Sequence, residues 1–566
     1  MVNTSLIVFI KEINKKLYLL LIFIGLTQIL HAQQKIVSGT VKDAISNESL
    51  PGATIAVKGT TIGTVTDING FYSLSVPGPE SVLVFSFVGF NSTEVIVGNM
   101  SEINISLAAN VSELEEVIVV GYGTQKVKDL TSSISTVKNE EILKTPAGQT
   151  MQALQGRVAG VQIINNGSPG SEPTVRIRGI GSYANTSPPL YVVNGALFDN
   201  IDFLNPSEIE SLSVLKDASA SAIYGVRAAN GVVLITTKGG RFNSKANITY
   251  DGYYGVQVPT NVLKMANTAQ FVEYVNQTGS AADKSYIDKV FQLWGRSKEN
   301  PELPAPNTDW YHEIMNPAAP IQNHSVAIAG GTENTAYSFG MSYFSQDGLM
   351  KMKNSYDRMN ITTKIDQKVN NWFKAGVSFN LSNAVRYIEQ SGAWFQAYHA
   401  VPVMPVRDEQ FYNQFIVSDD SLAAWGSPYA TAQNAGYRNT QNPFFALDYN
   451  EARQDIKKIQ SNIYSEITFL NEKLKFKTNY NIYTMFLKSR SFGTPYIIVN
   501  TDAERLSTSR LSSTLNSGRT LQVNQYWDNT LTYNQEFGNH NVTAMIGTSF
   551  RNEWYNGISG SVQGVP

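Results

Sequence analysis

The chain has 566 residues, of which 42% are hydrophobic, so it is long enough for several domains with cores of their own. Only 16% of the residues are charged, whereas Tyr and Phe number 28 and 26. The net charge of −2 argues against nucleic acid as a partner, and the absence of cysteine excludes disulfides, thiolate catalysis and Cys-ligated metals.

A targeting signal is predicted at the N-terminus. Lysines precede an apolar run at 17–30, and Ala32 provides a cleavage point. The run is shorter than the roughly 18 to 20 residues of a membrane-spanning helix, and no later stretch approaches that length. Residues 1–32 are therefore predicted to be the signal peptide of an exported protein, with an uncleaved anchor as the alternative.

Seven short segments of strand-forming composition follow, separated by turn sequences rich in Gly, Pro, Asn and Asp. They are 36–41, 53–57, 63–66, 71–76, 82–87, 94–97 and 103–107. This spacing predicts a small β-sandwich over 33–110. The stretch GTVKDAISNESLPGATIAVKGTTIGTVTDINGFYSLSVP resembles the carboxypeptidase-regulatory-like domain, which implies a transthyretin-like accessory module without peptidase activity.

The next segment, 111–125, contains ELEEVIVVGYGT, in which acidic residues precede four β-branched residues and a flexible Gly-Tyr-Gly. A strand of this kind can add to the edge of another protein's sheet through main-chain hydrogen bonds. An ordinary edge strand of the preceding sandwich is an equal alternative from these residues alone. The candidate coupling residues are Glu115, Glu116, Val117, Ile118, Val119, Val120 and Gly121.

Short strands and helices alternate over 126–240, which predicts a compact α+β domain. Helices are expected at 150–157 and at 218–224, the second ended by Gly225. Strands are expected at 161–164 and 232–237.

Four stretches of this domain are similar to one family. LQGRVAGVQI, TVRIRGIGS, PLYVVNG and LKDASASAIYGVRAANGVVLITTKGG resemble the plug domain of the SusC/RagA family of TonB-linked outer-membrane receptors. The plug residues of interest are Arg176, Arg178, Asn194, Gly195, Lys216, Asp217, Tyr224, Gly225, Arg227, Asn230 and Gly231. Asn194 stands where the family has Asp, and either residue suits a tight turn.

Arg176 and Arg178 are candidates for ion pairs between the plug and a surrounding barrel wall. Charges exposed to solvent on a strand are an equal alternative for both arginines. Gly239 and Gly240 mark the point at which the chain is expected to leave the plug for the wall.

Long strands that alternate apolar with polar residues are predicted over 241–566, as in a transmembrane barrel with lipid outside and water inside. They are placed near 245–258, 322–331, 335–346, 356–369, 372–386, 457–470, 474–487, 520–536 and 541–556. Long and short connections alternate, which orients the short turns to the periplasm and the long loops to the exterior. Within the first long loop, helices are expected around 268–275 and 286–294.

Nine strands are too few to enclose a folded plug, since plugged transporters of this class use about 22. An open sheet would also leave unpaired edges in hydrocarbon. We therefore expect the sequence to be the N-terminal part of a longer protein, with 241–566 forming the first part of a transmembrane barrel.

The resemblance implies a mainly β transporter in the outer membrane, with the sandwich and linker in the periplasm. It further implies three partners: TonB with its inner-membrane motor, bound at the linker; a SusD-like surface lipoprotein; and a large ligand, an oligosaccharide or less often a peptide. A signal-transducing receptor is the alternative. Such receptors carry a small signalling domain before the linker, and the sequence from Gln33 to Ile36 leaves no room for one.

No enzyme, cofactor or metal site is predicted. The histidines are scattered along the chain, at His31, His312, His324, His399 and His540, and no nucleophile, base and orienting group converge. The aromatic residues Trp394, Phe395, Tyr398 and Trp425 could stack on sugar rings, but interfacial girdles and loop cores are the favoured roles.

Overall fold

The structure is a computed structural model that describes residues 35–565, apart from 45, 88–89, 109–116, 121–122, 127–133, 182–187, 295–305, 408–428, 430–441, 501–504, 511 and 539. The chain divides into two compact units. The first comprises Met1–Ile118 and Thr124–Leu130, and the second comprises Val119–Gly123 and Thr131–Pro566.

The first unit contains a sandwich of a three-stranded sheet, β4-β1-β7, and a four-stranded sheet, β3-β2-β5-β6. The strands are β1 (Lys35–Asp43), β2 (Thr54–Val57), β3 (Gly63–Val65), β4 (Phe71–Val76), β5 (Val82–Ser86), β6 (Thr93–Ile96) and β7 (Ile105–Leu107). All seven predicted strands are confirmed. The inward residues of β4 alternate strictly with exposed ones, and Tyr72 meets Phe85 edge to face at 5.5 Å. The Tyr72 hydroxyl is satisfied by donating to the carbonyl of Ile103 at 3.0 Å.

In the linker, β8 (Val117–Val120) and β9 (Gly123–Lys126) form a two-stranded sheet. The predicted strand at Val117–Val120 is thus present. Glu115, Glu116 and Gly121 lie outside the described residues, and the binding of a partner strand to this segment stays a prediction.

The α+β domain in the second unit is built on a five-stranded sheet, β10-β15-β16-β13-β14, with a separate β11-β12 hairpin. The strands are β10 (Ile134–Lys138), β11 (Val161–Ile164), β12 (Thr174–Ile177), β13 (Leu190–Val193), β14 (Ala196–Phe198), β15 (Ile209–Leu215) and β16 (Val232–Thr237). The short helices are α3 (Asn139–Ile142), η2 (Gln152–Leu154), η3 (Pro206–Glu208), α4 (Ala218–Ser221) and η4 (Ala222–Ala228). All four residues of β13 are buried because apolar residues pack on both faces of this sheet.

The predicted helix at 150–157 is wrong, since only the 3-10 turn η2 forms there. Gly156 adopts a left-handed φ of 75°, which a continuous helix does not allow. The predicted helix at 218–224 is divided into α4 and η4, and Gly225 within η4 has a φ of 66°. Both predicted strands, at 161–164 and 232–237, are confirmed.

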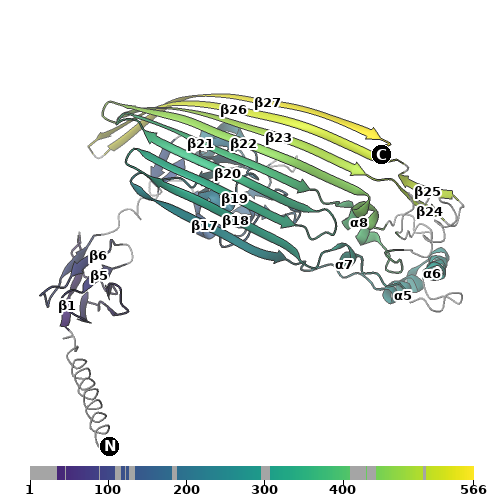
Figure 1. Ribbon diagram of the computed structural model, residues 1–566, viewed down its shortest axis with the longest axis horizontal. Helices are drawn as coiled ribbons and strands as arrows, with labels where there is room; N and C mark the ends of the chain where they lie inside the picture. The colour runs from purple at the N-terminus through teal and green to yellow at the C-terminus, as the bar shows by residue number, and fades with distance from the viewer. Residues whose placement is uncertain are drawn as a thin grey trace, which may run out of the picture. The chain divides into compact units, whose positions relative to one another are not determined.

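Nine antiparallel strands form one large curved sheet whose order follows the chain (Figure 1). They are β17 (Ser244–Gln257), β18 (Ala319–Gly331), β19 (Thr335–Asp347), β20 (Ser355–Lys368), β21 (Phe373–Tyr387), β22 (Asn450–Phe469), β23 (Leu474–Gly493), β26 (Thr514–Phe537) and β27 (His540–Gln563). Every predicted strand and the alternation of long and short connections are confirmed. The order begins at β17 and ends at β27, so these two strands do not pair in the part of the chain that the structure describes.

The two faces of this sheet differ in chemistry. The inner face, which contacts the α+β domain, buries polar side chains such as Asn323, Arg358 and Lys458. The outer face exposes a large apolar side chain on every strand: Ile248, Val326, Phe339, Met359, Val377, Ile463, Phe486, Trp527 and Phe550. Among the helices that the structure describes, none is long and apolar enough to cross a membrane.

Helices gather beyond the end of the sheet that carries the long connections (Figure 1). They are α5 (Thr268–Thr278), α6 (Ala281–Leu293), α7 (Trp310–Ile314), α8 (Gly392–His399) and α11 (Phe444–Asp448), near a hairpin of β24 (Tyr496–Asn500) and β25 (Arg505–Arg510). Helices at the two positions predicted in the first long loop are confirmed as α5 and α6.

The aromatic residues of α8 have different environments. Trp394 packs against the apolar core of these helices, as the sequence favoured, whereas Phe395 and Tyr398 are 61% and 53% exposed. Trp425 lies outside the described residues.

Candidate functional site

The α+β domain docks onto the inner face of the large sheet through residues 199–208, here called the docking segment. This segment connects β14 to η3 and is fixed at its end by Asn205, whose Oδ1 accepts a hydrogen bond from the Ser207 amide at 3.0 Å. The Asn205 amide group also donates to Asn323 of β18 at 2.7 Å. One side chain therefore both shapes the segment and anchors it to the sheet.

Glu208 is the most deeply placed acid of the segment. Its Oε1 accepts hydrogen bonds from Ser342 of β19 at 2.9 Å and from Asn360 of β20 at 3.1 Å. Burial raises the pKa of Glu208, and these two hydrogen bonds together with nearby Arg358 act in the opposite direction. The carboxyl group thus joins two adjacent strands to the α+β domain. Its burial destabilises the charged form relative to the neutral form.

Arg358 fills the space beside this carboxyl and is 2% exposed. Its guanidinium donates to the backbone carbonyls of Asp202 and Gly148, the second at 3.4 Å. The guanidinium also lies 5.7 Å from the ring centre of Phe344. Because an added Cβ at Gly148 would lie 2.5 Å from the Phe344 ring, the glycine lets the backbone approach the sheet this closely.

A second ionic contact joins Lys458 of β22 to Asp202, and its ammonium also reaches Asn200 at 3.3 Å. Protein atoms surround the carboxyl group of Glu172 in this region, although the residue as a whole retains exposure. Burial and the nearby Asp202 raise the pKa of Glu172 to about 7. Lys458 and Arg386 oppose that rise.

A third ionic contact reaches the last strand of the sheet. Arg227 pairs with Asp199 at 2.6 Å and with Glu553 of β27 at 3.0 Å. The hydroxyl of Tyr526 donates to the same Glu553 oxygen at 2.9 Å. Arg227 is therefore one predicted residue that bridges the two parts of the unit.

The ion pair of Arg178 differs from the predicted one. Arg178 meets Asp217 of its own domain at 2.5 Å, so this pair does not reach the sheet. The cause is local: Arg178 adopts a left-handed φ of 57° just after β12, which changes the direction of the side chain. Arg176 lies within β12, opposite Gln162 of β11.

Several other predicted residues shape the interior of the domain. Asn194 and Gly195 have φ values of 50° and 88°, as the expected tight turn requires. Asn194 also donates to Thr237 Oγ1 at 2.7 Å and accepts from the Thr237 amide at 3.1 Å, which holds the turn against β16. Lys216 donates to Ser135 of β10 at 2.7 Å.

The remaining predicted residues lie in or near η4. Tyr224 is buried in an apolar cluster that includes Tyr526 of the sheet. Asn230 lies within hydrogen-bonding reach of the Pro188 carbonyl at 3.5 Å. Gly231 has a φ of 89°, and an added Cβ would lie 2.8 Å from Ile177.

The sequence reasoning missed the docking segment and its partners. The missed residues are Asp199, Asp202, Asn205, Glu208, Arg358, Lys458 and Glu553. A signal existed for Arg358 and Lys458, because both occupy inward positions of an alternating strand. Nothing in the local sequence indicated which acids would face them.

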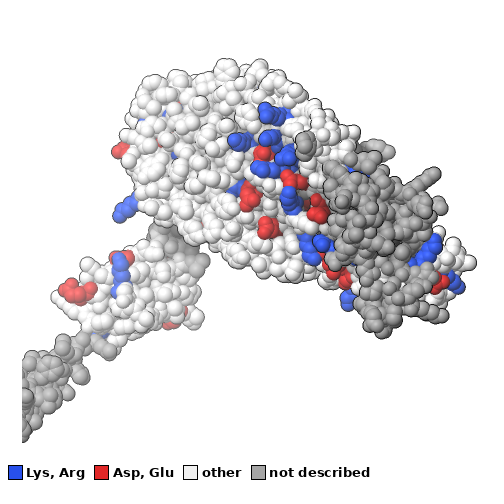
Figure 2. Space-filling view, turned by 45° about the vertical axis from the view of Figure 1, so that its right-hand side comes forward, with Lys and Arg blue, Asp and Glu red and all other residues white. Residues whose placement is uncertain are grey.

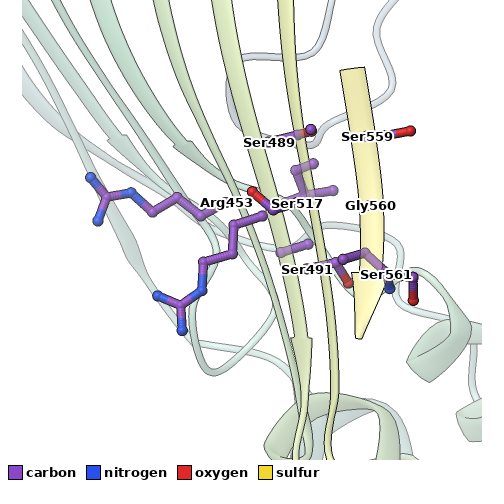
Figure 3. A pocket seen from close by; sticks show the side chains of 12 residues that line it. Arg453, Ser489, Ser491, Ser517, Ser559, Gly560 and Ser561 are labelled. Carbon is purple, nitrogen blue, oxygen red and sulfur yellow. The ribbon is translucent and has the colours of Figure 1, made fainter. Parts of the chain in front are cut away.

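A hollow of about 370 Å³ lies near the long-connection end of β22, β23, β26 and β27 (Figure 3). The strand register places Ser489, Ser491, Ser559 and Ser561 on the inner face, the same side as the docking contacts. The side chains of Arg453 and Ser559 extend to opposite sides of the strands (Figure 3). The inner face therefore offers a surface of hydroxyl groups beyond the docked domain.

Comparison with known proteins agrees with this architecture. Residues 126–232 match the TonB-dependent Receptor Plug Domain, and residues 37–119 match the CarboxypepD_reg-like domain. TonB-dependent receptor SusC of Bacteroides thetaiotaomicron is 31% identical over 454 residues, covering 76% of this chain and 42% of the relative. The solved RagAB peptide importer in its closed-closed state has the same fold, with a TM-score of 0.61 and 23% identity over 77% of this chain and 49% of that chain. The chain is of the SusC/RagA type of TonB-dependent receptor.

The α+β domain is accordingly the plug of this receptor type, and the large sheet corresponds to its wall. TonB-dependent receptor P26 of Formosa agariphila is 34% identical over 541 residues, covering 92% of this chain and 49% of the relative. The chain spans about half the length of the curated relatives it matches.

Proposed function

We propose that this receptor chain provides the plug and part of the transmembrane wall of an outer-membrane transporter that imports a large nutrient ligand. The observation that carries the proposal is the contrast between the two faces of the sheet. The plug is bound to the polar inner face, and large apolar side chains are exposed on the outer face of all nine strands. That arrangement suits lipid outside and a gated aqueous path inside.

Energy for import would come from the inner membrane through TonB, because no ATP is available at the outer membrane. The segment 113–121 is the proposed coupling site, and its strand β8 supports pairing with a strand of TonB. Force on this segment would act on the plug, whose docking segment binds the wall through polar and ionic contacts rather than through an apolar core alone.

The proposed ligand is an oligosaccharide, with a peptide as the second candidate, and a SusD-like surface lipoprotein would help to capture it. The serine hydroxyl groups on the inner face near the long-connection end support a ligand rich in hydrogen-bonding groups. The exposed rings of Phe395 and Tyr398 on α8 offer stacking surfaces at the same end. A receptor that takes up short peptides and no oligosaccharide would contradict this choice.

The coupling site is tested by a single substitution in the full-length receptor. Ile118→Pro removes a backbone N–H and a ladder hydrogen bond from β8, so ligand uptake should fall at least about tenfold. Surface binding of the same ligand should be unchanged. Ile118→Val is the matched control, because it keeps a β-branched strand former, and uptake by this variant should match the parent. Normal uptake by Ile118→Pro would exclude the segment as the coupling site.

A further inference from the structure

Five cationic side chains gather on the outer face of the wall, at the end that carries the long connections. They are Arg453 and Lys457 of β22, Lys488 and Arg490 of β23, and Arg519 of β26, here called the outer cationic patch. The strand register places these side chains on the outer face, because Lys458, Tyr483 and Tyr526 of the same strands contact the plug from the inner face. Residues an odd number of positions away point to the opposite face.

The patch is continuous across three strands. Arg453 lies opposite Arg490, and Lys488 lies opposite Arg519 in the ladder. Directly opposed residues have Cβ atoms roughly 5 Å apart, so like charges at these positions repel each other. Something other than strand pairing must compensate this concentration of charge.

Acidic residues in the described part of the chain neutralise only part of the positive charge of the patch. Arg453 pairs with Asp455 at 2.7 Å, the carboxylate that lies opposite Lys488. Lys457, Lys488, Arg490 and Arg519 are exposed, and none of them forms an ion pair with a residue that the structure describes. Four cations therefore remain open to an external anion.

The patch borders the apolar part of the outer face. Phe486 and Leu521 come next on this face toward the short turns, followed by Thr484 and Val523 and then by Ile482. Figure 2 shows Lys and Arg side chains, with a few acids, in a band beside a broad surface that is nearly free of charge. The cations thus stand where an apolar belt ends, which is the depth of lipid headgroups in the proposed orientation.

Space for a headgroup exists beside Arg490. Its neighbours across the ladder on the same face are Ser517 and then Gly560, both small and both exposed. An arginine next to small residues can present its planar donors to a phosphate in a bidentate manner.

We propose that the outer cationic patch binds the phosphate groups of lipid headgroups in the membrane leaflet on the long-loop side. The proposal rests on the proposed function, since it takes the apolar face as the lipid-facing one. Phosphate neutralises these open cations, while acyl chains of the same molecule cover Phe486 and Leu521. A soluble anion would supply only the first of these contacts, and the position beside the apolar belt therefore favours a lipid.

The test uses the full-length receptor in detergent, with diphosphorylated lipid A as the probe and its dephosphorylated form for comparison. Binding is measured by native mass spectrometry at increasing lipid concentration. The test variant is Lys488→Gln/Arg490→Gln/Arg519→Gln. The matched control, Lys245→Gln/Lys264→Gln/Lys284→Gln, removes three exposed cations from other parts of the same unit.

The parent and the control should bind diphosphorylated lipid A at least about tenfold more tightly than the dephosphorylated form, and the test variant should lose this preference. Equal binding of both lipids by the parent would overturn the proposal even if the test variant failed to assemble. An unchanged preference in the test variant would overturn it as well. Ligand uptake in cells is scored separately, so a failed lipid site and a failed transport function give different results.

Discussion

Glu208 is a buried carboxyl group of the plug that is bound by hydrogen bonds to two strands of the wall. One oxygen, Oε1, accepts from two wall strands, whereas Oε2 is buried without a hydrogen-bond partner among the described residues. A carboxylate that is only half satisfied can hold the docked state and still be released, because its charged form gains less from burial than from water.

This arrangement predicts a pH dependence of plug docking. Burial raises the pKa of Glu208 above its ordinary value of 4.5, so the docked state binds more protons than the undocked state above that pH. The docked state should therefore lose stability as the pH rises above that ordinary value. Glu208→Gln should flatten this dependence, since an amide keeps the Oε1 acceptor and has no charge.

The measurement is hydrogen exchange of residues 199–208 in the full-length receptor at pH 5 and 8. Exchange depends on pH by itself, so protection factors are compared rather than rates. Glu210→Gln is the control, because this exposed neighbour lies outside the docking contacts. If Glu208→Gln and the parent lose protection equally between the two pH values, Glu208 is not the titrating group.

At the scale of elements, glycines with left-handed backbone set how closely the plug strands approach one another. Gly231 precedes β16 with a φ of 89°, and a Cβ there would lie 2.8 Å from Ile177 of β12. Gly225 has a similar φ of 66°, but no atom would lie within 4 Å of its Cβ. Alanine substitutions at these two glycines therefore separate the free-energy cost of backbone strain from that of steric crowding.

Gly231→Ala should destabilise the plug by about 2 to 4 kcal/mol, the sum of backbone strain and overpacking. Gly225→Ala should cost about 1 to 3 kcal/mol, since its φ of 66° and ψ of −155° strain an alanine without crowding it. Both values come from denaturant unfolding followed by hydrogen exchange in β16. Equal destabilisation by the two variants would show that the contact with Ile177 is not limiting.

A left-handed backbone conformation also explains why Arg178 does not pair with the wall. Simple alternation would place Arg176 and Arg178 on one face of a strand, but β12 ends at Ile177 and the chain turns at Arg178. The predicted plug-to-wall bridge is made instead by Arg227, which lies on a short helical segment rather than a strand.

At the scale of the whole molecule, the N-terminal sandwich is a unit with a core of its own. Its buried residues, among them Tyr72, Phe85 and Leu107, pack with one another. A polypeptide of residues 35–108 should therefore fold alone and melt cooperatively, at a temperature close to that of the sandwich transition in the full-length receptor. Circular dichroism measures both, and a non-cooperative melt of the isolated sandwich would show that it depends on the rest of the chain.

The strands of the sandwich and the nine strands of the wall could be predicted from the sequence, because both depend on local alternation and on turn residues. The receptor type could be predicted as well, since the plug motifs are long and specific. Which charges meet across the plug and the wall depends on the three-dimensional fold. Glu208, Arg358 and Lys458 are separated from their partners by more than a hundred residues, and no local pattern relates Glu208 to Asn360 or Lys458 to Asp202.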